Sequence, residues 1–291
     1  MKGLMMHRPL KIADIITFAA DTYPHGEIVS VRTEGDIHRT TYRETAGRVA
    51  QLAHGLKALG VGQGDRIATL AWNGYRHFEL YYAISGIGAV CHTINPRLSA
   101  EQMIYIVNHA EDRLLFVDLT FVPIVEKLRN EFPADLRIVI MTDRAHMPET
   151  SLEGVLCYEE ILEGHPAEMD WPDFDENQAA GLCYTSGTTG NPKGTLYSHR
   201  STVLHAFSMC VTIPKVLFEG SRILPVVPLF HVNAWGLPYG APMSGTSLIF
   251  PGGALDGKSL FDLMDREKVF SAWGVPTVWL GLMNEIRQRG R

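Results

Sequence analysis

Short apolar runs that alternate with helical patterns fill the first half of the chain. The runs cover residues 66–72, 88–94, 113–118 and 136–141, and they are continuous stretches, without a regular alternation of polar residues. Strands that are apolar on both faces are typical of a parallel sheet with helices packed on either side. The pattern therefore predicts an α/β fold with largely parallel sheets.

Helix-start signals stand between these runs. Thr41 is followed by Glu44, and Ser99 by Gln102, at the spacing of a capping box. Apolar residues recur at helical spacing over about 42–59, so we expect a helix there. Single helices between successive strands are the connections that parallel pairing requires.

A change of pattern divides the chain into two parts. Pro, Gly and acidic residues gather between 142 and 178, which we interpret as a surface connection. Strand and helix signals resume after it, and a length of 291 residues suits about two domains. We expect two stacked α/β subdomains, with residues 1–178 forming the first and its connecting segment, and residues 179–291 beginning the second.

The charge balance bears on the kind of ligand. Lys and Arg total 26 against 32 Asp and Glu, which gives a net charge of -6, and no dense basic run is present. Proteins that bind nucleic acid or an anionic membrane surface typically carry a basic patch. We therefore expect no nucleic-acid partner and favour a dissolved small molecule as the ligand.

The cysteines and the N-terminus bear on the compartment. The four cysteines lie far apart and form no C-x-x-C pair. This spacing argues against a disulfide framework and against a thiolate zinc site. The N-terminus has no apolar stretch of the kind found in secretory signals. We expect a cytoplasmic protein.

One long segment needs to be tested against a membrane span. Residues 223–255 contain no Asp, Glu, Lys or Arg over more than the ~20 residues that cross a bilayer. Five prolines and five glycines interrupt this segment, and unpaired backbone groups are not tolerated facing lipid. We interpret it as buried core and pocket wall and expect no transmembrane segment.

The segment 184–194, Tyr-Thr-Ser-Gly-Thr-Thr-Gly-Asn-Pro-Lys-Gly, is rich in groups that bind phosphate. Glycines let backbone N–H groups approach an anion, Ser and Thr add donors, and Lys193 adds charge. It is not a Walker A loop, because Lys193 follows Pro192 and precedes Gly194. A flexible surface loop is the alternative, but the direct connection to a buried strand and the Pro-Lys-Gly ending favour a phosphate cradle.

This loop resembles the phosphate-binding signature of the acyl-adenylate-forming superfamily, which includes acyl-CoA synthetases, luciferases and peptide-synthetase adenylation domains. The likeness is strongest to bacterial medium- and long-chain fatty-acyl-CoA ligases and to their relatives that act on 3-(methylthio)propionate. Matching motifs lie at 40–42, 64–66, 72–74, 88–90, 95–98, 198–200, 228–235 and 274–279. The resemblance implies the truncated large N-terminal domain of an adenylate-forming enzyme.

The resemblance also implies a two-step ligase reaction with ATP, Mg²⁺ and CoA. The substrate carboxylate attacks the α-phosphate of ATP to give acyl-AMP and pyrophosphate, and the CoA thiol then displaces AMP. This chemistry needs no protein nucleophile, so catalysis depends on alignment and on neutralising the charge on the phosphates. The acid stays open among medium-chain, long-chain and methylthiopropionate substrates.

The same resemblance implies roles for the individual residues of the loop. Thr185 would place its hydroxyl on Mg²⁺. The residues that would hold the β- and γ-phosphates are Ser186, Gly187, Thr188, Thr189, Gly190 and Lys193. His231 would border the acyl carboxylate and the nucleotide, and with Lys193 it is a candidate catalytic residue.

Two further candidate residues follow from the motif at 228–235. Val232 would lie against the nucleotide, and Trp235 would gate the acyl tunnel in response to ATP. His231 and Trp235 each have a structural alternative, because a lone histidine among apolar residues and a large aromatic are both common in protein cores.

The resemblance covers little more than half of a full synthetase. The adenine-binding segment, the ribose-binding Asp, the hinge and the mobile C-terminal domain with its adenylation Lys have no counterpart in this sequence. We therefore expect an N-terminal part that is inactive by itself and that forms a homodimer. A non-catalytic module that binds an acyl chain, a nucleotide or a second copy of itself is the alternative function.

Overall fold

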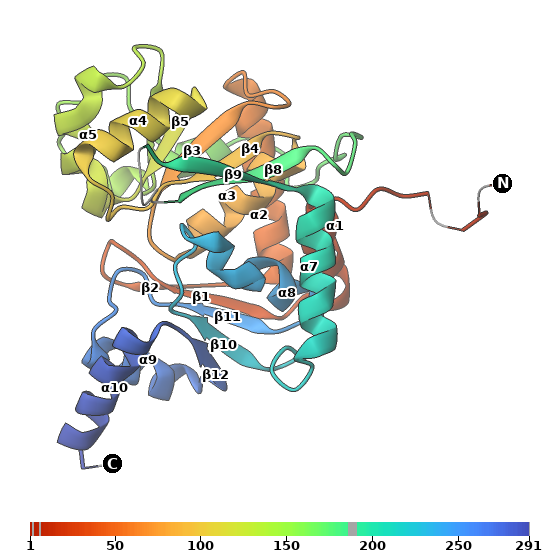
Figure 1. Cartoon of the computed structure of the whole chain (residues 1–291), viewed down its shortest axis with the longest axis vertical. Helices are drawn as coiled ribbons and strands as arrows, with labels where there is room; N and C mark the ends of the chain where they lie inside the picture. Colours follow the sequence, from red (N-terminus) through yellow and green to blue (C-terminus); the bar gives the residue numbers. More distant parts are fainter. Residues whose placement is uncertain (2, 6, 186–190, 291) are drawn as a thin grey trace.

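The computed structural model describes residues 1, 3–5, 7–185 and 191–290. Its strands form two sheets (Figure 1). In spatial order the larger sheet contains β7 (Leu156–Cys157), β6 (Arg137–Ile140), β5 (Leu114–Val117), β3 (Arg66–Leu70), β4 (Val90–Thr93), β8 (Ala179–Thr185) and β9 (Lys193–Ser198). All of its pairs are parallel except β8 with β9. The four apolar runs of the sequence correspond to β3, β4, β5 and β6.

The smaller sheet is also largely parallel. In spatial order it contains β12 (Ser271–Trp273), β10 (Arg222–Pro225), β11 (Ser247–Phe250), β1 (Glu27–Val31) and β2 (Ile37–Thr41). Only the hairpin of β1 and β2 is antiparallel among its described pairs. The prediction of an α/β fold with largely parallel sheets is therefore confirmed.

The two sheets exchange strands across the chain. The N-terminal strand β1 pairs with β11 in the smaller sheet, with Ile28 opposite Leu248. Conversely, β8 and β9 come after residue 178 but complete the larger sheet through the pairing of β8 with β4. The expected boundary at residue 178 therefore does not coincide with the division between the sheets, because strand pairing joins segments that are far apart in the sequence.

Ten α-helices of the described residues connect and cover the strands. They are α1 (Ala13–Thr22), α2 (Tyr42–Ala58), α3 (Tyr75–Gly86), α4 (Ala100–Ala110), α5 (Val122–Leu128), α6 (Tyr158–Leu162), α7 (His199–Thr212), α8 (Leu237–Ser244), α9 (Gly257–Glu267) and α10 (Pro276–Gln288). Both predicted capping boxes are present, Thr41 with Glu44 and Ser99 with Gln102. A third box at Ser198 starts α7 directly after β9.

The helix α3 lies between the two sheets together with α2 and α8 (Figure 1). All twelve residues of α3 are buried, including the polar Arg76, His77 and Glu79. A helix that is buried on every side must satisfy its polar side chains within the protein. The Tyr81 hydroxyl does so by donating to the Leu229 carbonyl oxygen, between β10 and α8, and the Tyr82 hydroxyl donates to the Pro238 carbonyl oxygen at the start of α8.

The uncharged segment 223–255 forms β10, the segment that follows it, α8 and β11, and most of its residues are buried. Its prolines and glycines keep the helical part short, since α8 spans only eight residues. Within the described ranges, none of the helices has the length and apolar character that crossing a membrane requires.

Candidate active site

The predicted phosphate loop connects the last two strands of the larger sheet. β8 ends at Thr185, and β9 begins at Lys193, which pairs with Thr185 across the antiparallel ladder. The Thr185 hydroxyl donates to the Lys193 carbonyl oxygen at 3.4 Å, and both side chains are exposed. Because β8 runs parallel to β4, the loop lies at the carboxyl end of the sheet, where α/β proteins bind their ligands.

Residues Ser186, Gly187, Thr188, Thr189 and Gly190 lie outside the described residues. Their contacts with phosphate therefore stay predictions, and so do the roles of Thr185 and Lys193, although the structure pairs these two residues across the ladder of β8 and β9.

The segment 228–236 adopts a backbone conformation that is rare for L-residues. Positive φ values occur at Val232 (48°), Asn233 (48°), Ala234 (47°), Trp235 (57°) and Gly236 (83°). A left-handed conformation costs roughly 1–2 kcal/mol for each residue with a Cβ, so the surroundings must hold this turn in place. Backbone strain of this kind gathers at functional sites.

Asn233 connects this turn to the strand that carries the loop. Its Oδ1 accepts a hydrogen bond from the Tyr81 hydroxyl at 3.2 Å and lies 3.6 Å from Cys183 Sγ. Cys183 is two residues before Thr185 on β8, and burial raises the pKa of its thiol. The turn and the predicted phosphate loop are therefore joined through a buried contact.

A cavity of about 340 Å³ opens beside the turn. Its walls come from β9, α7, the turn and α8, and they are Tyr197, Ser201, Thr202, His205, Val232, Asn233, Trp235, Gly236 and Tyr239. Aromatic and aliphatic side chains with a few polar groups are the usual composition of a small-molecule pocket. The structure thus brings Val232 and Trp235 to one cavity.

The exposure of His231 and Trp235 bears on whether they are ordinary core residues. Trp235 is 40% exposed, and its ring centroid lies 6.1 Å from that of Trp273. His231 is also exposed. Neither side chain has the burial of a core residue. Their contacts with a substrate stay predictions.

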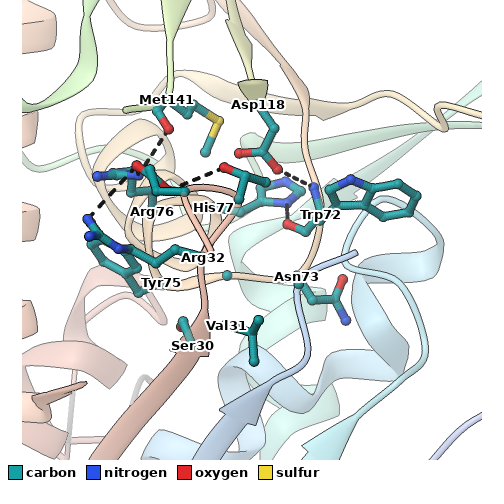
Figure 2. Close-up of a pocket in the computed structure, with 14 residues that line it drawn as sticks. Ser30, Val31, Arg32, Trp72, Asn73, Tyr75, Arg76, His77, Asp118 and Met141 are labelled. Carbon is teal, nitrogen blue, oxygen red and sulfur yellow. Dashed lines mark hydrogen bonds and ion pairs between the residues drawn. The ribbon is translucent and has the colours of Figure 1, made fainter. Parts of the chain in front are cut away.

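A second, much smaller pocket lies between the two sheets (Figure 2). Its volume is about 30 Å³, which is room for one or two water molecules and too little for a nucleotide. Charged groups surround it: Arg76 pairs with Glu34 at 2.6 Å and with Glu159 at 2.8 Å. The Asp118 carboxylate accepts a hydrogen bond from the Trp72 backbone N–H at 2.6 Å, and burial raises the pKa of Asp118 to about 7.

Several residues that shape the candidate site were missed by sequence reasoning. Asn73 belongs to a motif at 72–74 that carried no assigned role, and Tyr81, His205 and Asn233 were not singled out. Polar side chains such as Asn73 and Tyr81 within an otherwise apolar segment were the available signal, because buried polar groups are expected to be hydrogen-bonded.

The fold is that of a largely parallel α/β protein, and the predicted phosphate loop begins at the carboxyl end of β8. The family described as AMP-binding enzyme matches residues 17–290, and the chain belongs to this family.

Related proteins include two bacterial ligases. The chain is 48% identical over 290 residues to the 3-methylmercaptopropionyl-CoA ligase of Ruegeria lacuscaerulensis, a match that covers 100% of this chain and 54% of the relative. It is 48% identical over 285 residues to the medium-chain-fatty-acid–CoA ligase of Ectopseudomonas oleovorans, covering 97% of this chain and 52% of the relative. The chain thus spans about half the length of these curated relatives.

A solved structure with the same fold is the inhibitor-bound N-terminal domain of FACL13 from Mycobacterium tuberculosis. The two chains align with a TM-score of 0.79 and 26% identity, over 96% of this chain and 65% of that one.

Proposed function

We propose that the protein carrying this chain is an AMP-forming acid–thiol ligase. It joins a carboxylic acid to CoA at the expense of ATP, through an acyl-AMP intermediate, and releases AMP and pyrophosphate. The observation that carries the proposal is that β8, whose last residue Thr185 begins the predicted phosphate loop, contacts a strained turn that lines a largely apolar cavity. A phosphate cradle next to a pocket for an acyl chain is what adenylation of a fatty acid requires.

The loop would supply positive charge and hydrogen-bond donors to the phosphates of ATP. Lys193 is exposed at the start of β9 and is the cation of the loop, so we assign it to the phosphates that leave as pyrophosphate. A fixed charge aimed at phosphates accelerates a reaction because it stabilises the charge that develops in the transition state. The protein then needs no nucleophile of its own, since the substrate carboxylate attacks directly.

Thr185 could contribute an oxygen ligand to Mg²⁺. The described residues hold no cluster of three or more His, Cys, Asp or Glu side chains suited to a metal ion. Mg²⁺ in nucleotide sites keeps several waters and is bound mostly by phosphate oxygens, with one or two protein ligands. The exposed Thr185 hydroxyl fits that limited role, and the ion would there offset the negative charge of the phosphates.

The turn would present the acid to the nucleotide. His231 would border the carboxylate, Val232 would lie against the nucleotide, and Trp235 would cover the cavity that takes the acyl chain. The cavity wall is formed mainly by apolar and aromatic surface, which supports an acid with an aliphatic or thioether chain. Medium- and long-chain fatty acids and 3-(methylthio)propionate are the substrates we propose.

The test is product formation by the intact gene product that contains this chain. Purified protein is incubated with Mg-ATP, CoA and one of octanoate, palmitate or 3-(methylthio)propionate, and acyl-CoA and AMP are quantified by chromatography. We expect AMP and thioester in equal amounts with at least one of these acids. Formation of ADP, or of AMP without any thioester, would contradict the proposal.

A non-catalytic role is the second candidate, and the observation in its favour is that the chain spans about half the length of the relatives it matches. The 291 residues would then bind an acyl chain, a nucleotide or a second copy without turnover. A homodimer is also part of our proposal, as is a cytoplasmic location. Exposed apolar side chains such as Phe18 and Phe207 would be covered in a dimer, which light scattering would detect.

A further inference from the structure

Asn73 follows β3 and uses its side chain to hold the backbone that follows β10. Its Nδ2 donates to the carbonyl oxygens of Pro225 at 2.8 Å and Val227 at 2.9 Å, and the Leu229 backbone N–H donates to its Oδ1 at 2.7 Å. The side chain is buried, with 4% of its surface exposed. The two hydrogens and the carbonyl oxygen of the amide are thus all engaged by one short stretch of backbone.

The stretch needs such a partner because it cannot continue as a strand. Pro225 and Pro228 have no N–H to donate, so regular ladder pairing is interrupted there. The N–H groups of Val226 and Val227 both donate to the carbonyl oxygen of Trp273 at 2.8 Å. The carbonyl oxygens of Pro225 and Val227 also need donors, and the Asn73 amide supplies them. The Asn73 amide takes the place of a neighbouring strand at this point.

Tyr81 contacts both this stretch of backbone and the turn that follows it. Its hydroxyl donates to the Leu229 carbonyl oxygen and lies 3.2 Å from Asn233 Oδ1. Asn233 in turn lies 3.6 Å from Cys183 on β8. A connected path of hydrogen bonds therefore runs from Asn73 through the Leu229 backbone, Tyr81 and Asn233 to the strand that carries the predicted phosphate loop.

We propose that Asn73 is a positioning residue, which with Tyr81 fixes the turn at 232–236 relative to β8. This proposal rests on the proposed function, because the turn carries His231 and Trp235. Asn73 lies between β3 and α3 and is buried, and Tyr81 belongs to α3, which is buried on every side, so both groups are fixed by elements other than the turn. These contacts then hold in place the strain of four successive residues with a Cβ at positive φ.

Hydrogen exchange measured by mass spectrometry tests whether these hydrogen bonds hold the turn, and it does not require enzyme activity. The variants are Asn73→Ala and Tyr81→Phe, with Tyr82→Phe as the matched control. Tyr82 is on the same helix, and its hydroxyl donates to the Pro238 carbonyl oxygen at 2.7 Å, outside the turn. Tyr81→Phe removes one oxygen atom and keeps the ring, so it carries the test if Asn73→Ala does not fold.

For peptides covering 226–237 we expect exchange about tenfold faster in Asn73→Ala and Tyr81→Phe, since each loses buried hydrogen bonds. Tyr82→Phe should leave the amides of 229–234 unchanged. Wild-type protection of 229–234 in Tyr81→Phe, or equal loss in Tyr82→Phe, would overturn the proposal.

Kinetics then separate positioning from a general loss of stability. Acid-dependent exchange of pyrophosphate into ATP, measured in the intact gene product, should show kcat about tenfold lower in both variants, with KM for ATP within about twofold of wild type. The ATP phosphates are held by the loop between β8 and β9, and the variants leave that loop intact. An unchanged kcat in both variants would overturn the positioning role. Wild-type protein without acid-dependent exchange would refute the proposed function, while hydrogen exchange still decides whether Asn73 and Tyr81 hold the turn.

Discussion

The imidazole of His205 lies against the turn: its Nε2 is 3.2 Å from the carbonyl oxygen of Trp235. A Cβ built at Gly236 would stand 2.5 Å from His205 Cδ2. The turn is therefore held by two helices, by α7 at Trp235 and by Tyr81 of α3 at Asn233.

This contact leads to a prediction for Gly236→Ala. Position 236 has a φ of 83° and no room for a methyl group, so both strain and overlap oppose the substitution. We expect a loss of about 2–4 kcal/mol in the free energy of unfolding, measured by denaturant titration. Gly62→Ala is the control, because a Cβ there meets only ordinary contact at 3.8 Å. A loss no larger in Gly236→Ala than in Gly62→Ala would contradict the described turn.

Trp235→Ala distinguishes a tunnel gate from a core residue. A fully buried tryptophan costs about 3–5 kcal/mol of stability when truncated, but Trp235 is 40% exposed. We expect a loss below about 1.5 kcal/mol together with a changed preference between octanoate and palmitate in the intact gene product. Denaturant midpoints and kinetics on both acids provide the measurement. A large midpoint shift with unaltered preference would instead assign Trp235 to the core.

The raised pKa of Asp118 leads us to expect that the free energy of unfolding depends on pH. Burial raises the pKa of Asp118 to about 7 from its usual 3.8, so the folded state binds this proton more tightly than the unfolded state. This contribution is fully present below about pH 4 and is lost as the pH rises to about 7.

Asp118→Asn removes this titration and keeps an oxygen for the Trp72 N–H. The free energy of unfolding of the wild type should fall relative to that of the variant between pH 5 and 7, and the difference should level off above about pH 7. Urea titrations at pH 5, 6, 7 and 8 give the comparison. Parallel curves for the two proteins would show that Asp118 is charged throughout this range.

The parts of the fold that depend on local sequence were predicted well. The apolar runs gave β3 to β6, and the capping boxes at Thr41 and Ser99 gave the starts of α2 and α4 within a residue. Such signals are local, because capping involves residues three positions apart, and the apolar side chains of a strand themselves indicate that it is buried.

The parts that depend on distant contacts were not predicted. Nothing near Ile28 indicates that β1 pairs with β11, because the partner is about two hundred residues away. The left-handed turn has no local signature either, since Val232, Ala234 and Trp235 all disfavour positive φ on their own. Tertiary hydrogen bonds from Tyr81 and His205 reach this turn and those from Asn73 hold the backbone before it, and all of them are visible only in three dimensions.

The role of Lys193 can be measured by acid-dependent exchange of labelled pyrophosphate into ATP, compared between the wild-type intact gene product and Lys193→Ala. Loss of a fixed charge that stabilises phosphates costs on the order of 2.7–4 kcal/mol, so we expect exchange to fall by roughly 10²–10³ while the denaturant midpoint stays unchanged. Lys127→Ala, an exposed lysine on α5, is the control and should exchange like the wild type. Equal exchange in Lys193→Ala and the wild type, or exchange that proceeds without an acid, would contradict the assignment of the loop between β8 and β9 as the phosphate site of an acid–thiol ligase.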